Sequence, residues 1–233
     1  MKGLRPLFFY CPYFRNLHGK QARTIIFVIM ELIKALENRF GAHRVKSIQN
    51  PLHPDQELIV LLLELDVPVT VVMTASLSDY KMPVLDKWIG REFNEIYFCL
   101  PTYWDFEEHT NPNFSWIYTW IYKLERFVRD KNTWYGPGHT IPTGNPEVPI
   151  SETMPQEYFI FLDPILLQKE LAPVKIQEKT VQFLSIVPIF GDELDFKMGK
   201  GTQKFVRRFI QRKGDEKLDN YRRSILDSRL RFF

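Results

Sequence analysis

Cysteine is scarce in this 233-residue sequence, which contains only Cys11 and Cys99, far apart and each in an apolar setting. Two such cysteines do not form the disulfide framework of a small secreted protein, and no paired Cys/His spacing indicates a zinc site. Residues 105–109 place carboxylates beside a histidine, but a second histidine at ligand spacing is missing. We therefore predict a cytoplasmic protein with no metal and no cofactor.

The sequence also lacks uninterrupted apolar runs of about 20 residues, the length needed to span a bilayer. The apolar run at 25–30 is cut by Glu31 and Lys34, and it lacks the small-residue cleavage pattern of a secretory signal. We predict neither a membrane span nor a signal peptide.

Motifs of catalysis are missing as well. The sequence contains no nucleophile elbow, no P-loop and no dinucleotide-binding glycine fingerprint. Residues 136–138 (GPG) are not a phosphate cradle, because the proline removes an amide that a phosphate would use. The candidate acids and bases, such as His139, Asp163 and Glu193, are widely separated in sequence. We predict a protein that is not an enzyme and has no catalytic residues.

What the sequence does contain is typical of a globular fold. Hydrophobic residues make up 45% and charged residues 25%, while an aromatic content of 15% favours a sheet. Repeats, low-complexity segments and a linker between two halves are absent. We predict an N-terminal extension at 1–20 and one α+β domain at 21–233, with a mixed, mostly antiparallel sheet flanked by helices.

Apolar spacing locates the elements of this domain. Two runs at 57–65 and 68–74 are separated by only two residues, which predicts an antiparallel hairpin. The expected helices are 21–40, 115–129, 192–198 and a helix in the tail from Lys204, and the other expected strands are 45–48, 94–100, 157–162 and 180–189.

Charge is distributed unevenly along the chain. Residues 204–233 hold ten Lys or Arg against four Asp or Glu, whereas the rest holds 21 against 24. A basic tail can contact nucleic acid or an acidic partner. Because its arginines alternate with Phe205, Phe209 and Ile210 at helical spacing, the tail is also typical of a docked helix with a solvated basic face.

Residues 124–144 (LERFVRDKNTWYGPGHTIPTG) form the stretch most suited to recognition. A helix ends there and feeds a loop that glycine and proline make rigid. Aromatic residues and arginine carry much of the energy of protein interfaces. We predict a partner-binding site with Phe127, Trp134 and Tyr135 as anchors and with His139 and Arg126 as polar contacts.

Two alternatives to this prediction remain. The tryptophan and tyrosine rings can fold back onto the core, and His139 can simply cap a turn. If the partner is a strand, an exposed sheet edge such as 157–162 could accept it by sheet extension.

Four segments together resemble the suppressor-of-fused family. Residues 72–83 (VMTASLSDYKMP) resemble its strand-to-loop signature, and residues 95–101 (EIYFCLP) with Trp104 resemble the strand that follows. The loop at 138–139 and residues 183–189 (FLSIVPI), followed by Glu193 and Leu194, are similar to two later motifs. The resemblance extends over about residues 35–225 in family order.

This resemblance implies a non-enzymatic, protein-binding domain. Eukaryotic members hold an extended peptide of Gli-type zinc-finger transcription factors between this domain and a second, C-terminal one. Our sequence resembles the single-domain bacterial type, whose members are predicted to be immunity proteins that neutralise toxins. Phe127 stands where the eukaryotic form has a peptide-contacting tyrosine, Gly138 stands where it has an aspartate, and His139 matches.

We therefore expect a module that sequesters another protein, for example a toxin, through the aromatic loop and a cleft. The alternative is a nucleic-acid-associated or regulatory protein that acts through its basic tail, which we regard as less favoured. A small-molecule sensor is a third possibility. The sequence does not define the oligomeric state.

Overall fold

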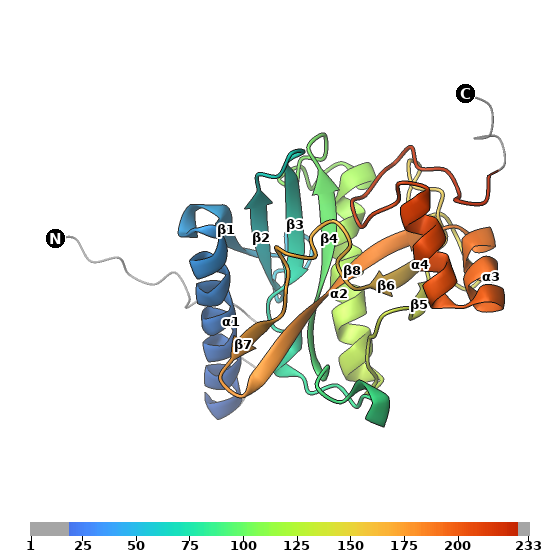
Figure 1. Cartoon of the computed structure of the whole chain (residues 1–233). Helices are drawn as coiled ribbons and strands as arrows, with labels where there is room; N and C mark the ends of the chain where they lie inside the picture. Colours follow the sequence, from blue (N-terminus) through green and yellow to red (C-terminus); the bar gives the residue numbers. More distant parts are fainter. Residues whose placement is uncertain (1–18, 228–233) are drawn as a thin grey trace.

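A single mixed sheet forms the centre of the computed structural model, which describes residues 19–227 (Figure 1). Its strands run in the order β1-β2-β3-β4-β8-β6-β5, and β7 pairs with β8. The strands are β1 (Val45–Gln49), β2 (Glu57–Leu63), β3 (Val69–Thr74), β4 (Phe93–Pro101), β5 (Thr140–Pro142), β6 (Tyr158–Leu162), β7 (Val174–Ile176) and β8 (Lys179–Ile189). The α-helices are α1 (Gly19–Phe40), α2 (Pro112–Asp130), α3 (Gly191–Lys200) and α4 (Thr202–Gln211).

The strand pairing confirms the predicted fold class. β2 and β3 form the expected antiparallel hairpin, with Leu61 opposite Val71. Among the described strands only β4 and β8 pair in parallel, with Ile96 opposite Leu184. The sheet is therefore mixed and mostly antiparallel, and it is flanked by helices as the sequence indicated.

Both faces of the central strands are buried, because side chains alternate across the sheet. In β2, Leu58 and Val60 face α2, whereas Ile59 and Leu61 face α1. Asn111 caps the N-terminus of α2, since its side-chain oxygen accepts a hydrogen bond from the backbone of Asn113 at 3.0 Å.

The helices cover the sheet from opposite sides (Figure 1). α2 packs on one face, where its side chains join the core of β2, β3, β4, β6 and β8. On the other face, α1 contributes the fully buried Leu32 and Leu36. α4 contributes the fully buried Phe205 and Phe209, which pack against β6 and β8. The sheet thus holds three clusters of apolar side chains in place.

The structure corrects the expected tail helix. α4 ends at Gln211, where Gly214 N donates to Phe209 O at 2.9 Å and Lys213 N donates to Ile210 O at 2.9 Å. These two bonds form the Schellman motif that ends many helices. A Cβ at Gly214 would lie 2.7 Å from the Phe209 ring, so a glycine is needed there. Residues 212–227 follow without further helix.

Other differences are smaller. The short strands β5 and β7 were not predicted, because three residues give too little periodicity to be recognised. α1 begins at Gly19, within the extension predicted at 1–20. The rest of that extension and Cys11 lie outside the described residues. Within residues 19–227, no helix has the length and apolar character needed to cross a membrane.

Candidate functional site

A groove of about 780 Å³ lies between the end of α2, the following loop and α3. It contains four of the five predicted site residues, namely Phe127, Trp134, Tyr135 and His139. The other lining residues are Trp120, Lys123 and Leu124 from α2, Thr133, Gly138, Thr140, Ile141, Pro142, Thr143 and Gly144 from the loop and β5, and Lys197 and Met198 from α3.

The last turns of α2 bring Phe127 to this groove. Leu124 and Val128 are almost fully buried, whereas Phe127 is 42% exposed beside Leu124 in the groove lining. Asn132 then turns the chain with φ 46°, a left-handed conformation that asparagine tolerates better than most residues. Its side-chain oxygen accepts a hydrogen bond from Tyr80 at 2.7 Å, which fixes the turn.

Tyr135 lies in the core, in agreement with the alternative reading of the sequence. It is 2% exposed, and its ring stacks on Phe161 with centroids 4.0 Å apart. Its hydroxyl donates to the backbone oxygen of Leu124 at 2.9 Å, and burial raises the pKa of this hydroxyl. Tyr135 therefore lines the groove from within the core, and little of its ring is accessible to a partner.

Trp134 is half-buried and shapes the wall of the groove. Its ring lies 4.3 Å from that of His139, edge to face, and 5.9 Å from that of Trp88. Gly136 leaves room for the indole, since a Cβ at this position would lie 2.4 Å from Trp134 Cζ3. The indole is thus held in place by three neighbours while part of it faces solvent.

His139 contacts the backbone of its own turn and also lines the groove. Its Nδ1 lies 3.3 Å from the backbone oxygen of Trp134, and the same side chain lines the groove. A carbonyl oxygen only accepts, so the proton of the neutral ring is on Nδ1 and Nε2 is the acceptor. Burial lowers the pKa of His139 below its usual value, and the nearby charges of Lys197 and Lys87 lower it further.

Arg126, the fifth predicted residue, does not line the groove. Its Nε lies 3.7 Å from Asp130 Oδ2, and its guanidinium lies 5.9 Å from the ring centroid of Tyr122. Lys123 and Lys197 supply the positive charge of the groove instead. The prediction of Arg126 as a rim contact is thus not supported by the geometry.

Sequence reasoning missed Lys123, Lys197 and Met198. Lys123 stands four residues before Phe127 on the same helix, so helical spacing could have placed it beside Phe127. Lys197 and Met198 lie in α3, which comes directly after β8 in the chain, and the packing of α3 brings both residues to the groove. Met198 is 69% exposed. No local signal indicates that arrangement.

The sheet edge beside the groove also differs from expectation. β6 is not free, because β5 pairs with it and Thr140 lies opposite Ile160. Two further bonds extend this pairing, from Gly138 N to Phe161 O at 2.7 Å and from Phe161 N to His139 O at 2.9 Å. The strand at this end of the sheet is β5, and it lines the groove.

Gly138 is required by the backbone. Its φ is 90°, and a Cβ there would lie 2.5 Å from Thr202 Oγ1. A left-handed conformation in so little space favours glycine. The aspartate that the family resemblance places at this position therefore does not fit here.

The candidate acids and bases His139, Asp163 and Glu193 do not lie together in one site. Glu193 is fully buried and pairs with Arg222, and Asp163 pairs with Arg91. Neither lines the groove with His139. Among residues 19–227, no group of three or more His, Cys, Asp or Glu side chains is placed to hold a metal ion.

The suppressor of fused protein (SUFU) family model matches residues 55–223, which is more than half of the sequence. The chain belongs to the suppressor of fused family. This confirms the resemblance, which rested on motifs within the same part of the chain. A comparison of this chain with curated proteins found no match.

Solved suppressor of fused structures share the fold at low sequence identity. A putative SUFU homologue from Neisseria gonorrhoeae aligns with a TM-score of 0.60 and 16% identity, over 87% of this chain and 99% of that one. Drosophila Suppressor of Fused aligns with a TM-score of 0.57 and 15% identity, over 85% of this chain and 51% of that one. A Sufu–Fu complex aligns with a TM-score of 0.57 and 16% identity, over 86% and 91%.

Proposed function

We propose that this chain is a non-enzymatic module that binds an extended segment of another polypeptide in the groove beside β5. The observation that carries the proposal is the combination of an apolar groove with a three-residue edge strand. An edge strand offers backbone hydrogen bonds to an added strand, and neighbouring pockets select its side chains. The Sufu–Fu structure, in which a protein of this fold forms a complex, supports the proposal.

Exposed aromatic surface supplies the anchors. Phe127 is 42% exposed, and Trp134 is half-buried but held by Trp88 and His139. Rings that are already fixed lose little conformational entropy when a partner binds. Phe127 and Trp134 are therefore the residues that we expect to contribute most to affinity, with His139 as the polar contact.

Charge indicates the chemistry of the partner. Lys123 and Lys197 line the groove, and its lining contains no carboxylate. Complementary charge favours the correct partner and accelerates association. We propose that the bound segment carries apolar side chains together with at least one acidic residue.

We further propose that the partner is a toxin and that the chain acts as an immunity protein. The similar length of the Neisseria gonorrhoeae homologue, of which 99% is covered, supports the comparison with bacterial members. A protein that sequesters a toxin needs a binding surface and no catalytic group. The groove supplies such a binding surface.

The experiment compares immobilised wild-type chain with Trp134→Ala and Phe127→Ala as baits for proteins of the source cell. We expect one polypeptide to bind the wild type and to be lost with either variant. Val67→Ala is the matched control, because Val67 is 55% exposed in the turn between β2 and β3 and does not line the groove. Equal capture by all four baits, with unchanged thermal unfolding, would exclude the groove as the binding site.

The toxin proposal has its own test. Co-expression of the chain with the captured polypeptide should rescue growth if that polypeptide is toxic, and Trp134→Ala should not rescue. A captured polypeptide without toxicity would retain the groove as a binding site and remove the immunity role.

A further inference from the structure

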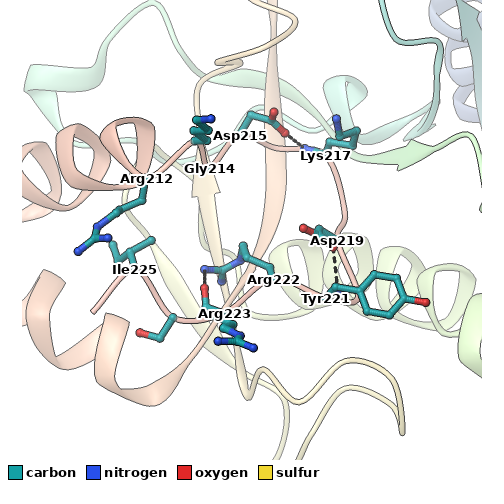
Figure 2. Close-up of a pocket in the computed structure, with 11 residues that line it drawn as sticks. Arg212, Gly214, Asp215, Lys217, Asp219, Tyr221, Arg222, Arg223 and Ile225 are labelled. Carbon is teal, nitrogen blue, oxygen red and sulfur yellow. Dashed lines mark hydrogen bonds between the residues drawn. The ribbon is translucent and has the colours of Figure 1, made fainter. Parts of the chain in front are cut away.

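The basic tail, which the groove does not use, surrounds a second hollow. Residues 212–225, here called the C-terminal loop, follow α4 and enclose a volume of about 420 Å³ (Figure 2). This volume lies within the range of sites for small molecules. Five basic residues line it, Arg212, Lys213, Lys217, Arg222 and Arg223, together with two acidic residues, Asp215 and Asp219.

Buried polar groups hold the C-terminal loop in shape. The carboxylate of Glu216, which is 1% exposed, accepts the backbone N–H groups of Ile165, Leu166 and Leu167 at 3.1, 2.7 and 2.8 Å. Leu218 N donates to the oxygen of Cys99 at the end of β4 at 2.8 Å. The hollow is therefore formed before any ligand arrives, although the loop contains no helix.

Among the residues that the structure describes, only one of the five basic side chains has a hydrogen-bond or ion-pair partner. Arg222 donates to Glu193 and to the backbone oxygens of Pro188 and Arg223. Within residues 19–227, the side chains of the other four basic residues form no hydrogen bond and no ion pair. Four cations at one fixed loop without partners are suited to a multiply charged anion.

The two acidic side chains of the hollow are engaged with the loop itself. Asp215 Oδ1 accepts Lys217 N at 2.7 Å, and Asp219 Oδ1 accepts Tyr221 N at 2.8 Å (Figure 2). These bonds fix the two turns of the loop and direct one oxygen of each carboxylate to the backbone. Since five basic residues and two acidic residues line the hollow, positive charge exceeds negative charge there.

An aromatic surface adjoins these charges. Tyr221 is 85% exposed, lines the hollow and lies 6.4 Å from Tyr103, which is 50% exposed. Flat rings beside lysine and arginine are the combination that proteins use for bases and phosphates. An inorganic anion would need only the charges, so the exposed tyrosine favours a ligand with a ring.

We propose that the C-terminal loop binds a nucleoside phosphate, with its phosphates at basic residues of the lining, Arg212 and Lys213 among them, and its base on Tyr221. This site is separate from the groove, since the two linings share no residue. The proposal goes beyond polypeptide binding and does not depend on it.

The test is calorimetric titration of the full chain with ATP and, separately, with pyrophosphate. The variant Arg212→Gln/Lys213→Asn should weaken ATP binding about tenfold or more, because charge-assisted bonds are lost. Asparagine is chosen at 213 because Lys213 has φ 62°, a left-handed conformation that asparagine adopts. Tyr221→Ala should weaken ATP binding and leave pyrophosphate binding unchanged.

The matched control is Lys204→Gln/Arg207→Gln, which removes the same charge from exposed positions of α4 outside the hollow. We expect this variant to bind ATP like the wild type, and Trp134→Ala to do the same. Thermal unfolding checks that each variant is folded. Equal weakening by both double variants would assign binding to diffuse net charge and overturn the proposal.

Three other results would also overturn it. ATP and pyrophosphate could both fail to bind the wild type. A single-stranded oligonucleotide could bind where ATP does not, which would make the loop a nucleic-acid surface. Finally, Arg212→Gln/Lys213→Asn could lower the unfolding temperature without changing ATP affinity, which would show that these charges only stabilise the C-terminus of α4.

Discussion

The guanidinium Nη2 of Arg222 lies 2.8 Å from Oε2 of Glu193, a residue with no exposed surface. Glu193 also accepts the backbone N–H of Phe190 at 2.9 Å and that of Ile225 at 2.9 Å. One carboxylate therefore joins the start of α3 to the end of the C-terminal loop. Because this loop has no regular secondary structure of its own, its position depends on such bonds.

Arg222→Met should destabilise the protein by about 3–5 kcal/mol, because removing one partner leaves a buried charge uncompensated. Urea denaturation measures the free energy of unfolding. Arg223→Met is the control, since Arg223 is exposed and unpaired within residues 19–227, and surface changes stay within about 0.5 kcal/mol. Equal midpoints for the two variants would show that the ion pair contributes nothing to stability.

The central part of the fold could be predicted because each element carries its own pattern. β2 and β3 are continuous apolar runs with a two-residue spacer, and α2 repeats apolar residues at helical spacing. The tail prediction failed beyond Gln211 for a specific reason. The helical spacing of apolar residues covered only 205–210, and Gly214, which ends the helix close to the Phe209 ring, was not recognised as a stop signal.

The site was predictable only in part. Phe127, Trp134 and His139 could be chosen because they flank a helix end and a glycine-rich turn. The sequence left open whether Tyr135 lies in the core, because Phe161, against which it stacks, comes from β6, and the sequence does not reveal that neighbour. Lys197 was missed for the same kind of reason, since it comes from α3.

Gly136→Ala should displace the indole of Trp134, because the added Cβ would lie 2.4 Å from Trp134 Cζ3. The rings of Trp88 and His139 restrict where the indole can go. Overpacking of this kind typically costs about 1–3 kcal/mol. We expect a shifted indole N–H resonance for Trp134 and a loss of partner capture.

The matched control for this change is Gly199→Ala. Gly199 lies in α3, and a Cβ there would meet nothing within 4 Å. Alanine favours a helix over glycine by roughly 0.5–1 kcal/mol, so this variant should be as stable as the wild type or more so. An unchanged Trp134 resonance in Gly136→Ala would contradict the predicted displacement.

Gly138→Ala should destabilise the loop for two separable reasons. The φ of 90° strains any side-chain-bearing residue by about 1–3 kcal/mol, and the added Cβ would lie 2.7 Å from Thr202 Cγ2. Thr202→Ala removes the two nearest atoms, Oγ1 and Cγ2, and leaves the backbone strain and the Cβ at 3.1 Å. A double-mutant cycle in urea should therefore show a smaller cost of Gly138→Ala in the Thr202→Ala background, and additive costs would exclude the clash.

The pH dependence of stability should depend on His139. Its pKa in the folded protein lies below the 6.5 of a free histidine, chiefly because of burial. As the pH falls below about 6.5, the unfolded chain binds this proton first, so the free energy of unfolding decreases until the folded protein is also protonated. The stabilisation by neutral His139 is thus complete above pH 6.5. It is lost as the pH falls from 6.5 through the pKa of His139 in the folded protein.

Urea denaturation across this pH range should show that decrease in the wild type and a flatter profile in His139→Asn. Asparagine can keep a donor for the Trp134 carbonyl, so the comparison isolates the titration of the ring. NMR of the imidazole would give the folded-state pKa directly. A value at or above 6.5 would contradict the predicted pH dependence, because burial would then not outweigh the hydrogen bond to Trp134 O, which raises the pKa of His139.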